Sequence, residues 1–345
     1  MPSLFGGLMP KVVASAPGKV TLFGEHAIVY GYPAIVTSID RRVYVTSEPR
    51  NDNTVKIMAL DLRVPGIIVT YKDNEVVVGT DYGQSLSAVA YLNKAVEIVS
   101  EYLNVRKGVN LIVRSEMPVG AGLGTSASVS VATIVAYAKS MGYDLSPDEV
   151  ASLGWRVEKE VQGIASPMDT SIATYGGILK IQATSTGKYV REKLNTETEL
   201  PIVIGYVERT ATTKEMVKMV KKLKERYPDL VDGIMKEIGT VTLEAEKALL
   251  KRDLEKVGEL MNINHGLLDS LGVSNYRLNE IVYVARAAGA LGSKLTGAGG
   301  GGAVIALAPN TQERVEVAMK LHSTMTLKTR VGVGGVAVKE LEKAP

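Results

Sequence analysis

The sequence predicts a mixed α+β protein, on three observations. Residues 11–78 read mostly as short strands separated by Gly, Pro, Asp and Asn. The second half alternates strand-like segments with long stretches of helical periodicity. Between them, Ser146, Pro147 and Glu149 form a capping box with proline at the first helical position, which predicts a helix over 147–161. This order of elements supports the α+β class.

The elements of the first half follow from apolar spacing. Helical periodicity spans residues 85–103, a strand is expected at 110–114, and a small-residue helical run extends to Tyr143. The short strands expected before them are KVVASA, KVTLFG, AIVTSI, VYVTSEP, TVKIMAL and EVVVG.

A polar stretch at 184–198, after the apolar strand ILKIQA, is expected to be a surface connection. We therefore expect two domains, residues 1–184 and 185–345. The second is expected to contain strands PIVIGYV, SKLTG and AVIALAP, a last strand near 332–339, and helices at 213–226, 230–251, 254–271, 278–288 and from 312.

Composition excludes several classes of function. The 345 residues are 46% hydrophobic and contain no cysteine, and the three histidines show no metal-ligand spacing, so any metal must bind oxygen. No apolar run reaches the ~20 residues of a membrane span, and the N-terminus lacks the features of a signal peptide, so a cytoplasmic location is expected. The basic run at 218–226 follows a helical pattern typical of a solvated face, so no nucleic-acid partner is expected.

The segment PVGAGLGTSAS at 118–128 follows an expected strand and precedes an expected helix. Glycines at alternate positions let backbone approach an anion, and a helix N-terminus presents free amides and a positive dipole end. The pattern fits a phosphate loop, and equally a glycine turn that packs a helix on a sheet.

A second glycine cluster, KLTGAGGGG at 294–302, formally contains the dinucleotide-binding fingerprint. The apolar run AVIALA that follows is strand-like, whereas that fingerprint requires a helix. No GxxxxGK[ST] occurs in the chain, so a P-loop is not supported either.

Two further segments carry charged residues. The segment at 16–35 places Lys19, Glu25 and His26 around a strand, where lone charges are usually solvated. The segment at 157–177 has Glu158 and Glu160 on the capped helix and Asp169 in the expected loop after it; an aspartate there is more often a turn or capping residue.

Taken together and in this order, the four segments resemble the motifs of the galacto-, homoserine, mevalonate and phosphomevalonate kinase superfamily. The resemblance spans residues 16–307. It implies an N-terminal α/β domain like that of a ribosomal protein, a ferredoxin-like α+β C-terminal domain, and an active site in the cleft between them. Within the superfamily, KVTLFGEHAIVYG and the segment at 262–281 are similar to mevalonate kinases.

The resemblance also implies roles for individual residues. Ser126 and Glu158 would hold Mg²⁺, with Glu158 preferred over Glu160 because the family's acidic ligand lies eleven residues before its aspartate. Asp169 would be the base and Lys19 its charged neighbour. The acceptor substrate would meet Glu25, His26, Ser166, Gly297 and Ala298, although QGIASP differs from the animal sequence around Ser166. The ATP phosphates would meet Pro118, Gly120, Ala121, Gly122, Leu123, Gly124, Thr125, Ser126, Ala127 and Ser128.

The function implied is ATP- and Mg²⁺-dependent phosphorylation of the 5-hydroxyl of mevalonate, in isoprenoid biosynthesis. The expected partners are mevalonate and ATP, with neither nucleic acid nor membrane; a homodimer is one option for the assembly. One alternative is a kinase acting on phosphomevalonate, homoserine or the tertiary hydroxyl of mevalonate. Another is a non-catalytic, RNA-binding protein, against which the joint presence of Lys19, Ser126, Glu158 and Asp169 argues.

Overall fold

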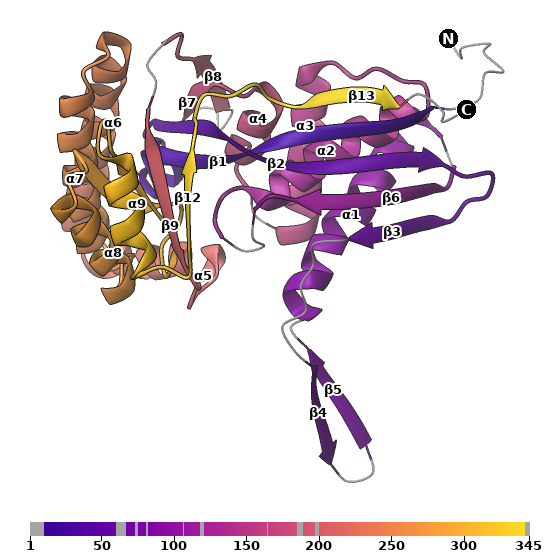
Figure 1. Cartoon of the computed structure of the whole chain (residues 1–345), viewed down its shortest axis with the longest axis horizontal. Helices are drawn as coiled ribbons and strands as arrows, with labels where there is room; N and C mark the ends of the chain where they lie inside the picture. The colour runs from indigo at the N-terminus through magenta and orange to yellow at the C-terminus, as the bar shows by residue number, and fades with distance from the viewer. Residues whose placement is uncertain are drawn as a thin grey trace.

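In the computed structural model two sheets, each covered by helices, meet along the first strand of the chain (Figure 1). The structure describes residues 10–59, 67–72, 75–80, 82–105, 107–117, 121–163, 165–184, 189–196 and 200–341. The α+β class predicted from the sequence is confirmed.

The first sheet has seven strands, in the order β13-β1-β2-β6-β3, with β7 pairing β2 and β8 pairing β7. Only the β3–β6 pair is parallel among these described pairs. The strands are β1 (Lys11–Phe23), β2 (Ala34–Pro49), β3 (Val55–Ala59), β6 (Val109–Ser115), β7 (Ile178–Ala183), β8 (Tyr189–Lys193) and β13 (Ala337–Leu341). A separate hairpin, β4 (Ile67–Lys72) with β5 (Glu75–Thr80), projects away from this sheet (Figure 1).

The expectation of separate short strands at the start of the chain was wrong. KVVASA and KVTLFG form the single strand β1, and AIVTSI and VYVTSEP form β2. Their pairing shifts register between Pro17 and Gly18, and this irregularity accommodates the polar residues Asp40 and Arg41 without ending either strand. A Cβ at Gly18 would lie 2.1 Å from the sulfur of Met117, so the punctuating glycine serves close packing.

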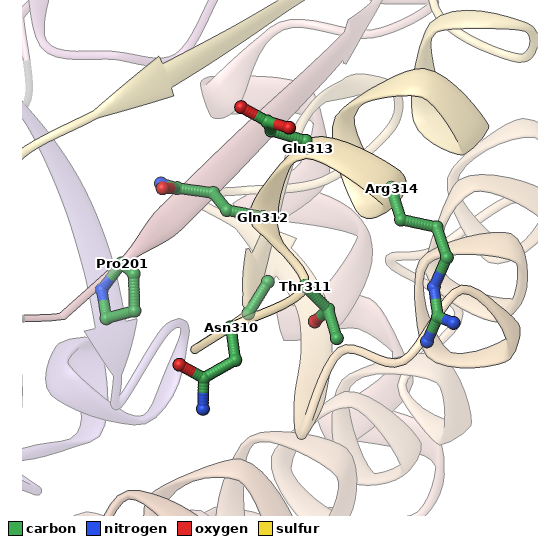
Figure 2. Close-up of a pocket in the computed structure, with 7 residues that line it drawn as sticks. Pro201, Asn310, Thr311, Gln312, Glu313 and Arg314 are labelled. Carbon is green, nitrogen blue, oxygen red and sulfur yellow. The ribbon is translucent and has the colours of Figure 1, made fainter.

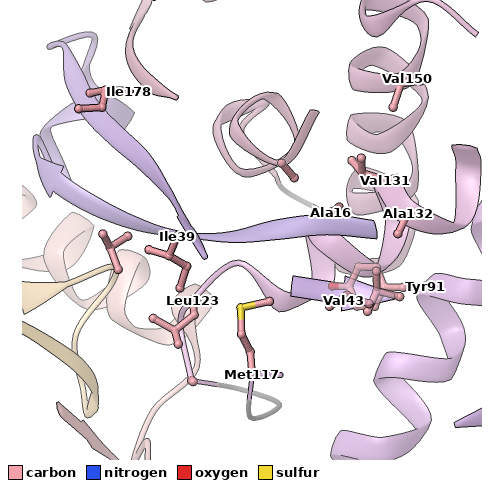
Figure 3. Close-up of a cluster of buried hydrophobic side chains, with 14 of the residues drawn as sticks. Ala16, Ile39, Val43, Tyr91, Met117, Leu123, Val131, Ala132, Val150 and Ile178 are labelled. Atoms are coloured by element: carbon pink, nitrogen blue, oxygen red, sulfur yellow. The ribbon is translucent and has the colours of Figure 1, made fainter. Parts of the chain in front are cut away.

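Four helices cover one face of the first sheet: α1 (Tyr82–Leu103), α2 (Thr125–Ser140), α3 (Pro147–Gln162) and α4 (Met168–Tyr175). The capping box predicted at Ser146 is confirmed, and α3 begins at Pro147. Figure 3 shows part of the apolar core between these helices and the sheet, including Tyr91, Met117 and Leu123. The prediction that Asp169 lies in a loop was wrong. It stands in the first turn of α4, where its charge suits the positive end of the helix.

The second sheet is antiparallel, in the order β10-β11-β9-β12, and the expected ferredoxin-like arrangement of strands and helices is built on it. Its strands are β9 (Ile202–Val207), β10 (Gly292–Thr296), β11 (Gly302–Leu307) and β12 (Met325–Thr329). The helices are α5 (Thr213–Arg226), α6 (Pro228–Lys251), α7 (Leu254–Ser270), α8 (Tyr276–Ala287) and α9 (Gln312–Lys320), each within a few residues of its expected place. None of the described helices is both long and apolar enough to cross a membrane.

Two strands from the C-terminal side of residue 184 belong to the first sheet. β8 lies inside the polar stretch expected to be a surface connection, and that expectation was wrong: an edge strand needs only one side paired and tolerates exposed charged residues. β13 pairs with β1 at the other side. Arg42 donates to the carbonyls of Gly334 and Gly335, which holds the segment leading to β13. The boundary at residue 184 stays a prediction.

Candidate active site

The glycine loop before α2 contacts the middle of β1, at residues 17–19. The backbone N–H of Lys19 donates to the carbonyl of Leu123 (2.8 Å), and the hydroxyl of Ser128 lies 2.7 Å from the carbonyl oxygen of Pro17. Ser128, Ala121, Leu123 and Ala127 are buried, whereas Thr125 and Ser126 are partly exposed. Pro118 and Gly120, predicted to contact phosphate, lie outside the described residues.

Two glycines of this loop have left-handed backbone and different surroundings. A Cβ at Gly122 (φ +77°) would meet no described atom within 4 Å, so this position faces open space. A Cβ at Gly124 (φ +73°) would lie 2.7 Å from Cγ of Lys19. Because Gly124 is also the N-cap of α2, the first-turn amides of that helix have no side-chain cap from it. The loop therefore has both the space and the amides that an anion needs.

Lys19 connects the loop to Asp169. Its ammonium lies 3.2 Å from Oδ1 of Asp169 and 3.5 Å from the hydroxyl of Thr21, and its side chain is only 6% exposed. That Asp169 oxygen, although buried, accepts no hydrogen bond from any residue in the described part of the chain. The direct contact between Lys19 and Asp169 supports the prediction from sequence that the two residues act together.

Glu158 projects from α3 toward the same place. Burial and the neighbouring charge of Asp169 raise the pKa of Glu158 to about 7, while Ser126 and Lys19 act in the opposite direction. Gln162 donates to its Oε2 (3.3 Å), and within the described ranges nothing donates to its buried Oε1. Glu160, the alternative on the same helix, is exposed and pairs with Arg156 and Lys94.

These oxygens suit a hard divalent cation. Glu158 Oε1 and Asp169 Oδ1 are both buried and accept no hydrogen bond from the described residues, although the Lys19 ammonium lies 3.2 Å from the second oxygen, and Ser126 lies beside Glu158. Mg²⁺ commonly takes one or two carboxylates and completes its shell with water and substrate phosphates. In the part of the chain that the structure describes, no cluster of three or more His, Asp or Glu offers a cage made by protein alone.

Tyr91, from α1, was not singled out from the sequence. Burial raises its pKa to about 12, with a further contribution from Glu158, while Gln162 and Ser126 lie close enough to lower it. Its phenol therefore belongs to the same polar cluster. An aromatic residue at a core position of an amphipathic helix gives no signal of such a role.

The second glycine cluster faces the first. A Cβ at Gly297 would lie 3.8 Å from the carbonyl oxygen of Gly122, and a Cβ at Gly302 would lie 3.6 Å from that of Ala121. Strand β11 follows this cluster, which confirms that it is not a dinucleotide-binding turn. The carbonyl of Ala298 lies 2.9 Å from Nε2 of His26.

His26 is held tightly at this junction. Its φ is +61°, an uncommon conformation for a residue with a side chain, and it is 6% exposed. Burial lowers its pKa, so the neutral ring is favoured. Because the atom of Ala298 in this contact is its carbonyl oxygen, which can only accept, the Nε2–H of His26 must be the donor.

Two other residues predicted to contact the acceptor, Ser166 and Glu25, have different surroundings. Ser166 is partly exposed in the segment between α3 and α4, next to Ala165, whose carbonyl accepts from the indole of Trp155 (2.8 Å). Glu25 is buried, with both carboxylate oxygens bonded to Lys294 and Asn264. Lys294 begins the quoted glycine cluster, but its role as the partner of Glu25 could not be read from spacing.

Arg209 is a second cation that sequence reasoning missed. It follows β9, and its side chain would lie 3.7 Å from a Cβ at Gly302, the same position that approaches the carbonyl of Ala121. Burial lowers its pKa, and its Nε has no hydrogen-bond partner among the described residues. Its position beside both glycine loops adds positive charge where an anion would bind.

A separate hollow of about 500 Å³ lies at the far end of the second sheet (Figure 2). It is lined by Pro201 and by residues 310–314 around the start of α9. In the pairing of β9 with β11, Ile202 faces Leu307 at that end and Val207 faces Gly302 at the other. The hollow is therefore separated from the glycine loops by the length of the strands.

Comparison with known proteins agrees with this geometry. Residues 90–177 match the GHMP kinases N terminal domain and residues 245–326 match the GHMP kinases C terminal domain. Residues 3–49 match a galactokinase galactose-binding signature. Two facing glycine loops, a lysine and two carboxylates, Glu158 and Asp169, on such domains define a GHMP small-molecule kinase.

The particular family follows from relatives over the whole chain. Mevalonate kinase of Pyrococcus horikoshii is 44% identical, covering 96% of this chain and 99% of its own. The structure of L. major mevalonate kinase with R-mevalonate is 28% identical, with a TM-score of 0.80, covering 93% and 96%. That of Methanococcus jannaschii mevalonate kinase is 31% identical, with a TM-score of 0.76, covering 94% and 98%. The chain belongs to the mevalonate kinase family.

Proposed function

We infer that this enzyme transfers the γ-phosphoryl group of ATP to the 5-hydroxyl of mevalonate, giving 5-phosphomevalonate and ADP. The observation that carries the inference is the contact between Lys19 and Asp169, 3.2 Å apart, beside the open position at Gly122. An ammonium paired with a carboxylate next to an anion-binding loop supplies what phosphoryl transfer needs: position and charge neutralisation.

The phosphates of ATP lie against the loop 121–124 and the start of α2 in this proposal. Amides in the first turn of that helix donate to phosphate oxygens, and the positive dipole end favours the negative charge. Arg209, beside the same loop, adds a second fixed positive charge. These groups stabilise charge that develops on the transferred group without having to reorganise.

Ser126 and Glu158 would hold Mg²⁺, and the charge of Asp169, which acts on Glu158, would further favour a cation there. Bound there, the ion would neutralise phosphate charge and orient the γ-phosphoryl group. Glu158 suits this role because its pKa near 7 leaves it ready to ionise when a cation arrives. Tyr91 limits the space on the α1 side and keeps the cluster out of water.

The acceptor hydroxyl lies beside Lys19 and Asp169. As the new bond from its oxygen to phosphorus forms, the bond from phosphorus to the ADP oxygen breaks, and Asp169 accepts the hydroxyl proton. Lys19 places its positive charge 3.2 Å from Asp169, beside the reacting oxygen. His26, Ser166, Gly297 and Ala298 remain the predicted acceptor contacts. The cytoplasmic location and the homodimer also stay predictions, to be checked by fractionation and light scattering.

A coupled assay of ADP release against mevalonate, phosphomevalonate, homoserine and galactose tests the substrate. We expect turnover with mevalonate to exceed the others by orders of magnitude. Phosphorus NMR of the product then tests the position. A phosphate coupled to a methylene identifies the 5-hydroxyl, whereas a phosphate without that coupling identifies the tertiary hydroxyl and contradicts the proposal.

A further inference from the structure

A buried ion pair joins the two sheets directly beneath the acceptor side of the site. Lys294, on β10, is fully buried and bonds to Oε1 of Glu25, which follows β1. Asn264, on α7, donates to the other oxygen of Glu25 (3.1 Å). The ammonium of Lys294 also donates to the carbonyl of Leu295 (2.7 Å). A carboxylate that is 4% exposed, with both oxygens bonded, has little left to offer a substrate directly.

The pair is one of three links between the same two segments. In the second, the N–H of Thr21 donates to the hydroxyl of Thr296 (2.8 Å), which donates back to the carbonyl of Thr21 (3.0 Å). In the third, His26 bonds to the carbonyl of Ala298 (2.9 Å). Residues 21–26 are therefore fixed against 294–298 at three points.

The backbone at His26, in the link to Ala298, needs support from its surroundings. His26 has a φ of +61°, and a side chain in that region persists only where the surroundings determine it. A buried ion pair is weak support for stability, since apolar residues of similar volume often replace it without loss. We therefore assign the Lys294–Glu25 pair a role in positioning residues 25–26 and not in stabilising the fold.

We propose that Lys294 is a positioning residue for phosphoryl transfer: by holding Glu25 it fixes the turn carrying His26 against the loop carrying Ala298, where the acceptor alcohol binds. The proposal rests on the proposed function and assigns Glu25 an indirect role. ATP, which meets the enzyme on the loop before α2, should not depend on this link.

The decisive variant is the neutral pair Lys294→Met with Glu25→Gln. Lys294→Met alone leaves a buried, unpaired carboxylate and should lower the urea midpoint, whereas the double variant removes that charge and should recover most of the loss. Although the stability of the double variant returns, we expect its kcat/KM for mevalonate to be at least tenfold below that of wild type, mainly because KM is higher. Its Kd for ATP, measured by calorimetry, should stay within twofold.

Lys180→Met is the matched control. Lys180, on β7, forms a 2.6 Å bridge to Glu246 on α6, so it also joins the first sheet to a helix of the second part, but away from the glycine loops. Its kcat/KM should stay within twofold of wild type. A double variant with wild-type kcat/KM, or a Lys180→Met variant with the same loss, would overturn the proposal.

Two further measurements test the proposal if the double variant does not fold or if wild type does not act on mevalonate. If the double variant does not fold, Asn264→Ala removes the hydrogen bond that an uncharged side chain donates to Glu25, and an unchanged KM for mevalonate would count against the proposal. If wild type does not phosphorylate mevalonate, the proposed function fails. Hydrogen exchange still tests the link itself, because the amide of Thr21 should exchange at least tenfold faster without Lys294, and an unchanged rate refutes it.

Discussion

Replacing Glu158 with glutamine should make the substrate-free enzyme more stable at high pH. Burial, together with Asp169, raises the pKa of Glu158 from 4.5 to about 7. A raised carboxyl pKa means that the folded state binds the proton more tightly than the unfolded state. Its stabilising contribution is therefore complete below pH ~4.5 and is lost as pH rises through about 7. Glutamine resembles the protonated acid and has no charge to bury.

The magnitude follows from that interval. At about 1.4 kcal/mol for each pH unit, the cost of ionising Glu158 approaches about 3 kcal/mol above pH 8. Urea unfolding of wild type and Glu158→Gln, from pH 4 to pH 8.5 without metal, should show curves that coincide in acid and diverge as pH rises. Mg²⁺ with ADP should flatten the wild-type curve, because a bound cation favours the ionised carboxylate.

Glu160→Gln is the control on the same helix. Glu160 is exposed, and hydrogen bonding to Arg156 lowers its pKa, so this change should cause no gain in stability at high pH. Parallel pH curves for wild type and Glu158→Gln would refute the reasoning. So would full catalytic activity in Glu158→Gln combined with its loss in Glu160→Gln.

Three more substitutions test the loop and the reacting pair. Gly122→Val should abolish ATP binding in calorimetry, because its side chain would fill the space proposed for phosphate, while Gly142→Val, with equally left-handed backbone (φ +86°) and open surroundings, should bind ATP normally. Equal losses of ATP binding in the two variants would show that backbone strain, and not a filled phosphate site, causes the effect. Gly124→Ala should lower kcat at least tenfold by displacing Lys19, and unchanged kcat would contradict the close packing. Asp169→Asn and Lys19→Met should each lower kcat by orders of magnitude, with the double variant little worse than the poorer single; additive losses would indicate independent roles.

Local signals predicted the parts of the fold that depend on neighbouring residues. The helix at 147–161 was predicted almost to the residue, because a capping box is a contact between residues three apart. The division of β1 into two strands failed, since Gly18 indicates a break unless its contact with Met117 is known. β8 failed for a similar reason: its pairing partner, not its own polar sequence, makes it a strand.

In the candidate site too, some contacts could be predicted from the sequence and others could not. Lys19 and Asp169 were paired through family motifs, and the structure brings them together although they are 150 positions apart in the sequence. The partners of Glu25 were out of reach, because Asn264 and Lys294 lie far along the chain and their side chains meet it only after both sheets have formed. From its place in the sequence alone Glu25 was expected to be solvated, and only the family resemblance made it an expected contact of the acceptor.

The return of β13 to the first sheet affects how the chain can be made. Strand β1 leaves the ribosome long before residues 337–341, with which it pairs on one side. Until those residues emerge, this side of β1 presents unpaired backbone that another strand can occupy. Long-range pairing of this kind also slows folding, because a large loop must close first. During synthesis the first half therefore needs protection from aggregation, and removing residues 337–341 would prolong that need indefinitely.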